Sequence, residues 1–248
     1  MTIQEKRILA KDSVDIGVDD LQRLNSRFEY ESVEDLLIWV SETFGNEAVL
    51  GTGFGPSGMV LIHKITQLDL DIKAFCLDTN LLFEETYNLW NKVEKRFNIN
   101  VESVSPILTL EGQAKLHEEK LWETNPDQCC YLRKVLPLQK YLSNKRAWIT
   151  GLRRSQSQMR KDVEKIEWDS SNKVFKLNPL ANWSQEKIWE YIKEQDLPYN
   201  PLHDEGYPSI GCIPCTEPAT GESERSGRWK NLEKTECGIH LPNLNKDK

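Results

Sequence analysis

Stretches of strand character alternate with stretches of helical character along the first 150 residues, and this alternation constrains the fold most. Apolar residues three and four positions apart predict helices, and short apolar runs between them predict buried strands. Strands are predicted at 48–51, 72–77, 100–104 and 147–150, and helices at 33–44, 57–68, 83–97 and 127–142. Strands separated by helices pair in parallel, so the sequence predicts an α/β fold with a doubly wound, mostly parallel sheet.

The periodicity changes in the last third of the chain. Residues 165–168 and 173–177 flank a Ser-Ser-Asn turn and predict a hairpin, and Ser184 caps a helix that ends near Gln195. Residues 198–248 hold six of the eleven prolines and five of the thirteen glycines, which is typical of a long loop or tail. In the predicted helix that starts at Asp127, one side carries Tyr131, Val135, Leu138 and Leu142.

The charge balance limits the partners of the chain. Its 248 residues include 32 Lys and Arg against 39 Asp and Glu, a formal net charge of −7. A global attraction to nucleic acid or to an anionic membrane is therefore not expected, and any anionic ligand needs a local basic patch. The apolar runs are short and the first twenty residues are too polar for a signal peptide, so we expect a cytoplasmic protein without a membrane segment.

Two loops that follow predicted strands carry candidate nucleotide contacts. The first, with Gly53, Phe54, Gly55 and Ser57, opens a helix, so its N–H groups suit an anion, although such a loop can also be only a tight turn. It matches neither a Walker A loop nor a dinucleotide fingerprint. The second is Leu77-Asp78-Thr79, where the Asp side chain could accept a hydrogen bond from a ribose or an adenine, or could cap the next turn.

Arginines gather in two further segments of this acidic chain. Arg153, Arg154 and Arg160 follow the predicted strand at 147–150, and guanidinium groups at the end of a strand suit phosphate or sulfonate oxygens. Arg225 and Arg228 form the second group, for which a solvated polar loop is the simpler interpretation when the segment is considered alone.

Six cysteines carry the strongest chemical signal. Cys129-Cys130 and Cys212-Ile-Pro-Cys215 form two pairs that could bind a zinc ion or a 4Fe–4S cluster. Adjacent cysteines are unusual in zinc ribbons, which favours the cluster. Cys76 lies in an apolar strand and is expected in the core. Cys237 remains, near His240, and is either a nucleophile or an inert thiol; the neighbouring Glu236 would disfavour its thiolate.

In combination, these motifs resemble the assimilatory sulfonucleotide reductases, which act on adenylyl sulfate or on its 3′-phosphorylated form. The resemblance runs from about residue 30 to residue 241 and covers seven motifs in matching order. These are the Gly-Phe-Gly loop, Leu77-Asp78-Thr79, Cys129-Cys130 with Lys134, Thr150-Gly-Leu-Arg-Arg-Ser-Gln-Ser, Cys212-Ile-Pro-Cys215, Glu224-Arg-Ser-Gly-Arg-Trp229 and Glu236-Cys-Gly-Ile-His240.

The resemblance implies the adenine-nucleotide α-hydrolase-like fold, which is related to the ATP pyrophosphatases. Their Ser-Gly-Gly-x-Asp-Ser loop is replaced here by Thr52-Gly-Phe-Gly-Pro-Ser-Gly, which is consistent with a site that holds no pyrophosphate. The implied organisation is a leader over residues 1–30, a nucleotide-binding α/β domain with an iron–sulfur site over 31–215, and a flexible tail over 216–248 that carries the catalytic cysteine.

The resemblance also implies an activity and its residues. Cys237 would attack the sulfur of adenylyl sulfate, release AMP and become S-sulfonated, and thioredoxin would then release sulfite, in the sulfate assimilation that leads to cysteine biosynthesis. Cys129, Cys130, Cys212 and Cys215 would hold the 4Fe–4S cluster. The implied substrate-binding residues are Gly53, Phe54, Gly55, Ser57, Leu77, Asp78, Thr79, Lys134, Gly151, Arg153, Arg225, Arg228 and His240. A homo-oligomer, either a dimer or a tetramer, is the family expectation.

Three alternatives stay open at the level of sequence. The enzyme could reduce 3′-phosphoadenylyl sulfate, or both nucleotides, because the sequence does not reveal a 3′-phosphate pocket. It could be an ATP pyrophosphatase or a tRNA-thiolating enzyme, although the altered loop and the acidic charge argue against both. It could also be a zinc-stabilised nucleotide-binding module in which Cys237 has no catalytic role.

Overall fold

A six-stranded sheet forms the centre of the protein. The computed structural model describes residues 17–219, 224–229, 234 and 236–240, and the rest of the predicted leader and tail lies outside these residues. The strand order is β3-β2-β1-β4-β6-β5. Every neighbouring pair is parallel except β5 with β6. The strands are β1 (Ala48–Gly51), β2 (Lys73–Leu77), β3 (Val101–Val104), β4 (Ala147–Ile149), β5 (Ile166–Asp169) and β6 (Val174–Leu177).

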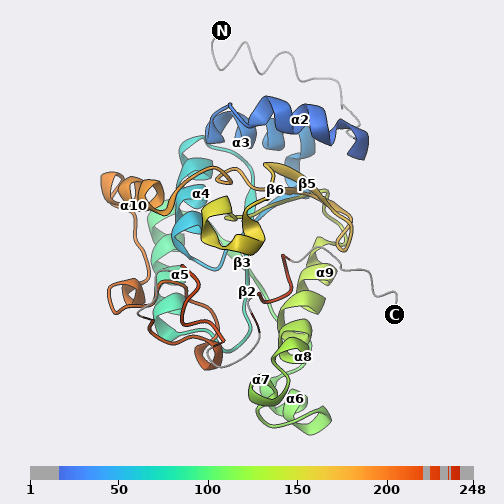
Figure 1. The fold of residues 1–248 in the computed structure, drawn as a ribbon, viewed down its shortest axis with the longest axis vertical. Coiled ribbons are helices and arrows are strands. Elements are labelled where there is room, and N and C mark those ends of the chain that lie inside the picture. The colour runs from blue at the N-terminus through green and yellow to red at the C-terminus, as the bar shows by residue number, and fades with distance from the viewer. Residues whose placement is uncertain (1–16, 220–223, 230–233, 235, 241–248) are drawn as a thin grey trace.

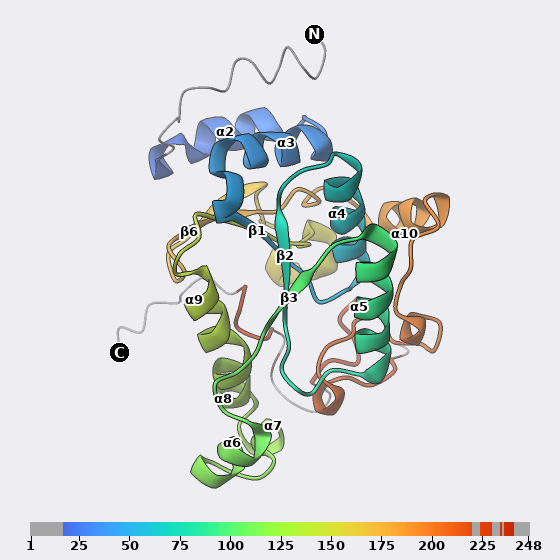
Figure 2. The ribbon, with the colours of Figure 1, turned by 180° about the vertical axis from the view of Figure 1, so that it is seen from behind.

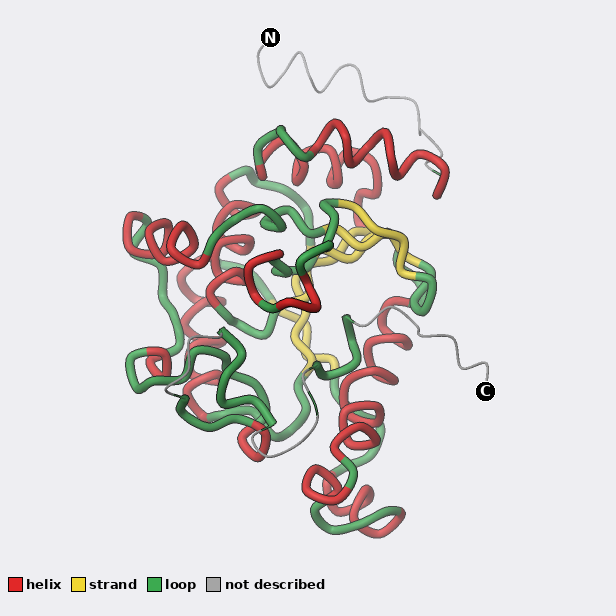
Figure 3. Tube along the Cα trace, viewed as in Figure 1, coloured by secondary structure: helices red, strands yellow, loops and turns green. Residues whose placement is uncertain are grey.

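Helices cover both faces of this sheet, as Figures 1 and 2 show from opposite sides, and Figure 3 separates helix, strand and loop by colour. The α-helices are α2 (Leu21–Phe28), α3 (Val33–Phe44), α4 (Pro56–Gln67), α5 (Glu84–Phe97), α6 (Leu110–Leu116), α7 (Leu121–Thr124), α8 (Pro126–Cys130), α9 (Leu136–Leu142) and α10 (Gln185–Glu194). The predicted doubly wound, mostly parallel α/β fold is therefore confirmed. None of the helices in the described part of the chain is long and apolar enough to cross a bilayer.

Side chains alternate between the two faces along each strand. On β1, Leu50 belongs to the larger apolar cluster, which includes the buried side chains of α3, α4 and α10. Its neighbour Val49 belongs to a smaller cluster with Leu138 and Leu142 of α9. A strand with apolar residues on both faces must be covered on both sides, which is why its sequence is continuously hydrophobic.

The predicted helix over 127–142 is interrupted by a π-helical turn, Tyr131–Val135. A π-turn adds a residue to the helical repeat and changes which side chains share a face. Leu138 and Leu142 are buried, but Tyr131 is 45% exposed, so the side predicted to carry all four residues is not one continuous buried face. The turn also carries Lys134, one of the candidate site residues.

The predicted hairpin does form, and its second strand extends the main sheet. β6 pairs in parallel with β4, so the hairpin forms the edge of the sheet on the β4 side. The side chain of Asn25 on α2 donates to Ile166 O (2.7 Å) and accepts from Ile166 N (2.9 Å). This amide satisfies backbone groups of the edge strand β5, and it gives part of the expected leader a place against the sheet.

Helices α6 and α7 were not predicted. Both are short. Thr109 caps α6 by accepting from Gly112 N, whereas α7 starts without a side-chain cap. Fewer than two full turns give too little periodicity to distinguish a helix from a loop. They lie at the far end of the column formed by α8 and α9 (Figure 1).

Candidate active site

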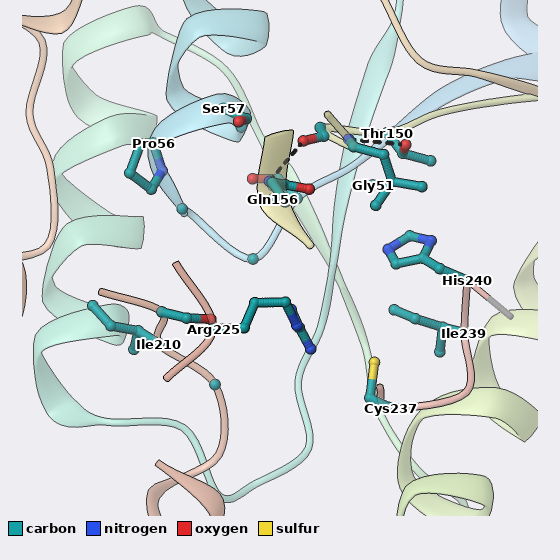
Figure 4. A pocket seen from close by; sticks show the side chains of 18 of the residues that line it. Gly51, Pro56, Ser57, Thr150, Gln156, Ile210, Arg225, Cys237, Ile239 and His240 are labelled. Atoms are coloured by element: carbon teal, nitrogen blue, oxygen red, sulfur yellow. Dashed lines mark hydrogen bonds between the residues drawn. The ribbon is translucent and has the colours of Figure 1, made fainter. Parts of the chain in front are cut away.

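A cavity of about 320 Å³ opens at the carboxyl ends of the parallel strands. The chain runs from β1 outward to β2 and β3, then returns to place β4 on the other side of β1. The loops after β1 and β4 therefore diverge, and a crevice forms between them, which is where ligands bind in open α/β sheets. Gly53 and Gly55 line the cavity from the first loop and Gly151 from the second. Figure 4 shows the cavity from close by.

The glycine-rich loop contributes only part of its predicted contacts. Gly53, Gly55 and Ser57 line the cavity, and α4 starts directly after Gly55. Phe54 does not line it, because its ring is buried and packs against Trp90 at a centroid distance of 5.3 Å. Ser57 Oγ accepts a hydrogen bond from Arg153 Nε at 3.0 Å, so this loop and the loop after β4 are joined directly.

The loop after β2 places two of its three candidates at the cavity. Leu77 and Thr79 line it, whereas Asp78 does not. The Asp78 carboxylate accepts from Asn80 N at 2.9 Å and from the Tyr87 hydroxyl at 2.7 Å. This geometry fits the turn-capping interpretation of Asp78, and the predicted contact with a nucleotide stays untested.

Five cationic side chains line the cavity. They come from three segments that are distant in sequence: Lys134, Arg153, Arg160, Arg225 and Arg228. Among the described lining residues, the only carboxylate is that of Glu224, which accepts from Arg153 Nη2 at 2.5 Å. The local positive excess contrasts with the net charge of −7 for the chain, and it suits an anionic ligand.

Arg154 is not part of this basic group, which corrects the expectation that all three arginines after β4 serve one anion site. Its guanidinium donates to both carboxylate oxygens of Glu29, at 2.6 and 2.8 Å, and to Val163 O at 2.7 Å. Arg153 has an extended backbone (φ −136°, ψ 145°) and directly precedes a 3₁₀ turn over Arg154–Gln156, and the two neighbouring side chains have different partners.

The described C-terminal residues reach the same cavity. Cys237, Ile239 and His240 line it, and Figure 4 shows all three on one side with the Arg225 guanidinium extending toward them. The His240 ring stacks on Trp148, with centroids 5.3 Å apart and planes 14° from parallel. Burial, with the positive charges of Lys176, Arg160 and Arg225, holds the pKa of His240 well below its usual value.

Two ring nitrogens at this side of the cavity have unused hydrogen-bonding capacity within the described part of the chain. His240 Nδ1 and Trp148 Nε1 are buried and have no hydrogen-bond partner among the described residues. Unsatisfied buried polar atoms are rare in native proteins, and their position beside the cavity supports a functional role for this side of it. Trp148 is a site residue that the sequence analysis did not identify, because a Trp in a strand reads as core.

The four paired cysteines lie next to the cavity. Cys129, Cys130 and Cys212 are buried and Cys215 is half-buried, and Cys212 itself lines the cavity. Burial and neighbouring thiols raise the pKa of Cys129 to about 11, and the same causes raise the pKa of Cys215 to about 11. These mutual effects place the two pairs close together, although they are separated by 81 residues in the sequence.

Cys212 differs from the other three thiols. Burial alone would raise its pKa, but Lys134, a hydrogen bond with Thr79 Oγ1 (3.2 Å between oxygen and sulfur) and Arg228 together lower it. For Lys134, burial lowers the pKa, but the charges of Cys212 and neighbouring thiols outweigh that effect and raise it. Lys134 therefore stays cationic between the thiol group and the cavity.

Within the described ranges, no three His, Cys, Asp or Glu side chains are close enough to form a site for a single metal ion. Four thiols from two adjoining pairs are nevertheless the donor set that an iron–sulfur cluster requires, because each iron corner takes one cysteine sulfur. Cys76, by contrast, is 1% exposed, and burial raises its pKa far above the usual range. This confirms it as a core residue.

A buried arginine that the sequence analysis missed supports the site from behind. Arg133 is 1% exposed, and its guanidinium donates to Thr79 O (2.7 Å), Asn80 Oδ1 (3.0 Å) and Gln113 Oε1 (3.1 Å). It thereby fixes the loop whose Thr79 contacts Cys212. Nothing in the sequence distinguishes Arg133 from a solvated helix residue, because its partners lie 20 or more positions away.

Comparisons with known proteins agree with this geometry. Residues 47–218 match the model of the phosphoadenosine phosphosulfate reductase domain. A protein named adenosine 5′-phosphosulfate reductase from Salinibacter ruber is 50% identical over 223 residues, which is 89% of this chain and 88% of that protein. The crystal structure of a phosphoadenylyl-sulfate reductase from Candida auris, a phosphate complex, is similar with a TM-score of 0.72 and 32% identity, covering 83% of this chain and 100% of that one.

A more distant structural likeness concerns the fold alone. Candida glabrata FMN adenylyltransferase superposes with a TM-score of 0.54 at 17% identity, covering 93% of this chain and 81% of that one. This likeness agrees with the expected α/β fold. The match to more than half of the chain, together with the high identity over most of its length, shows that the chain belongs to the phosphoadenosine phosphosulfate reductase family, among the relatives named adenosine 5′-phosphosulfate reductases.

Proposed function

We propose that this protein is an oxidoreductase that reduces adenylyl sulfate to sulfite and AMP, with Cys237 as the nucleophile and thioredoxin as the electron donor. The observation that carries the proposal is the convergence of Cys237 and five cationic side chains on one cavity at the switch point of the sheet. A sulfonated nucleotide brings several anionic oxygens, and guanidinium and ammonium groups are their natural partners.

In the first step, the Cys237 thiolate attacks the sulfur of adenylyl sulfate. A bond forms between Cys237 Sγ and the substrate sulfur, and the bond from that sulfur to the phosphate oxygen breaks. AMP leaves with the electron pair of that bond, and Cys237 becomes an S-sulfocysteine. Negative charge develops on the departing phosphate, where cations such as Arg225 and Arg228 would stabilise it.

In the second step, a thioredoxin thiolate attacks Cys237 Sγ. The sulfur–sulfur bond of the S-sulfocysteine breaks, sulfite leaves with its electron pair, and a mixed disulfide forms. The second thioredoxin thiol then resolves this disulfide and regenerates Cys237, so the two electrons come from the dithiol. A nucleophile outside the regular helices and strands suits this order of events, because it must meet first the substrate and then a protein.

Adenylyl sulfate is proposed as the substrate in preference to its 3′-phosphorylated form. The proteins with 47–50% identity are named adenosine 5′-phosphosulfate reductases, whereas the structural relative that acts on the phosphorylated nucleotide has 32% identity. The value of kcat/KM for each nucleotide tests this choice. A preference for the 3′-phosphorylated form, or equal use of both, would replace it with one of the alternatives.

Cys129, Cys130, Cys212 and Cys215 are proposed as the ligands of a 4Fe–4S cluster. The cluster would supply an electrostatic and structural element that joins α8 to the segment around Cys212, since dithiol chemistry needs no separate electron carrier. Cys130→Ser and Cys212→Ser are each expected to lose iron and activity together, measured by iron content, absorbance near 400 nm and sulfite release. A protein isolated with zinc and no iron would contradict the ligand assignment.

The decisive experiment is anaerobic incubation with adenylyl sulfate labelled on sulfur, without a reductant. We expect label on the peptide that contains Cys237 and on no peptide with the other five cysteines, which serve as internal controls. Cys237→Ser should take no label and release no sulfite, while iron content and AMP binding stay near those of the unchanged protein. Label that remains in Cys237→Ser would remove this cysteine from the mechanism.

The cellular setting and the assembly rest on the same proposal. Free thiols and a thioredoxin partner indicate a reducing compartment, and we place the reaction in the cytoplasm. A homo-oligomer remains the family expectation, and light scattering of the purified protein would test it.

A further inference from the structure

The carboxylate next to the catalytic cysteine has an unusual environment. Glu236 is 6% exposed although it is charged. Arg160 Nε and Nη2 donate to its two oxygens at 2.9 and 2.8 Å, and Arg225 Nη2 lies 3.1 Å from Glu236 Oε2. One buried carboxylate thus bridges two arginines that both line the cavity.

Each member of this triad comes from a different segment of the chain. Arg160 follows the loop after β4, and its Nη1 donates to Gln156 Oε1 at 2.5 Å, which fixes the guanidinium from its other side. Arg225 belongs to the polar segment 224–229. Glu236 precedes Cys237 directly, so an ion pair with rigid, forked geometry lies one residue from the nucleophile.

Two further contacts hold the residues after Cys237. Ile239 packs against the smaller apolar cluster of the sheet, and the His240 ring stacks on Trp148. The apolar and stacking contacts lie on the C-terminal side of Cys237. On its N-terminal side, the described residues contribute the Glu236 triad and, two positions earlier, an ion pair between Lys234 and Asp127. The segment 236–240 is therefore held on both sides of the thiol, and Cys237 faces the cavity between them.

We propose that Glu236 is a positioning residue: its ion pairs with Arg160 and Arg225 dock the segment 236–240 and hold Cys237 in line with the substrate sulfur. This inference rests on the proposed function, because it assigns a role in that reaction. The sequence analysis expected the negative charge of Glu236 to disfavour a thiolate at Cys237. The positive charges of Arg160 and Arg225 compensate that charge.

A competing role for Glu236 predicts the opposite result. In that role, the carboxylate would occupy the anion site while the cavity is empty, and the substrate would displace it. Its removal would then leave two cations free for the nucleotide, and the substrate would bind more tightly. A positioning role instead predicts normal nucleotide binding and a slower transfer, because misplacement of a nucleophile by about 1 Å can cost about a hundredfold in rate.

The test compares Glu236→Gln, Glu236→Asp and the unchanged protein, with Glu29→Gln as the matched control. Glu29 also makes a forked ion pair with an arginine that follows β4, through Nη1 and Nη2 of Arg154, but neither residue lines the cavity. We expect Glu236→Gln to slow S-sulfonation of Cys237 in a single turnover by at least about tenfold, with the AMP dissociation constant unchanged within about twofold. Glu236→Asp should recover part of the rate, and Glu29→Gln should keep the full rate.

A second measurement does not depend on the reaction. The rate at which a neutral alkylating reagent modifies Cys237, followed on its peptide without nucleotide, should rise several-fold in Glu236→Gln because the segment undocks. If the unchanged protein takes no sulfonate label, the proposed function fails, while this alkylation comparison still tests the docking. Unchanged transfer and alkylation rates in Glu236→Gln, or tighter substrate binding, would overturn the positioning role.

Discussion

Replacing Arg133 with Met should destabilise the protein strongly, although Arg133 does not itself line the cavity. Its guanidinium is buried and serves the acceptors Thr79 O, Asn80 Oδ1 and Gln113 Oε1 at 2.7 to 3.1 Å. Methionine fills a similar volume but donates nothing, so the two buried acceptors, Thr79 O and Gln113 Oε1, lose their partner, at about 1–3 kcal/mol each, and the partly buried Asn80 Oδ1 adds less. The energy recovered by not desolvating a charge offsets part of this loss.

In total, the free energy of unfolding should fall by about 3 kcal/mol, which is near the low end for breaking a buried charged contact. For a chain of this length, 1 kcal/mol corresponds to about 2–4 °C, so the melting temperature should fall by about 10 °C. The measurement is a thermal melt of anaerobic samples with equal iron content. AMP binding should weaken as well, because the loop that carries Thr79 loses its support.

Arg23→Met is the matched control for this prediction. The Arg23 side chain is 70% exposed, and its ion pair with Asp20 at 2.8 Å is on the surface. Surface pairs contribute little, so its melting temperature should stay within about 2 °C of the unchanged protein. If Arg133→Met also melted within about 2 °C, the buried network would not support the site as argued.

Two other predictions concern the site and the pH dependence of stability. A Cβ at Gly211 would overlap the guanidinium of Arg228, so Gly211→Ala should displace Arg228. The KM for the sulfated nucleotide should then rise about tenfold, which corresponds to about 1.4 kcal/mol. If Arg228→Ala raised the KM and Gly211→Ala did not, this prediction would be refuted. Burial lowers the pKa of Lys165 to about 8, and its ammonium donates to Pro179 O at 2.8 Å. Because the unfolded chain binds this proton more tightly, stability should rise between about pH 8 and pH 10.4, by at most about 3 kcal/mol. Over this pH range, the melting temperature of the unchanged protein should therefore rise relative to that of Lys165→Met. A difference between the two melting temperatures that does not change with pH would contradict the lowered pKa of Lys165.

Much of the fold could be predicted from local patterns. The strands around Ala48 and Ala147 and the helix capped by Ser32 were predicted within about a residue, because hydrophobic periodicity and capping are local properties. The π-turn at Tyr131–Val135 was not, since its extra residue leaves no mark in the pattern. The short helices α6 and α7 were missed because so few residues show no period.

The candidate site could also be predicted only in part. The residue types of the site were evident in sequence, since cysteine pairs, a glycine-rich loop and clustered arginines each need a particular chemistry. The structure brings Gly53, Ser57, Lys134, Arg225 and His240 to one cavity, and it turns Phe54 and Asp78 away from it. The direction of each loop made that selection, and it cannot be inferred from the spacing of residues in the sequence.

The sequence by itself determined the fold class and the residue types that the site can use. These are a parallel α/β sheet, four thiols in two pairs, a further cysteine and enough arginines to hold an anion. Only the tertiary structure decided which charges meet. Arg153 and Arg154 are neighbours, yet one lines the cavity and the other pairs with Glu29 outside it. Arg160 and Glu236 lie 76 positions apart and form one buried ion pair. Ion pairing depends on distances through space, and those are fixed by how the sheet and its loops pack rather than by order along the chain.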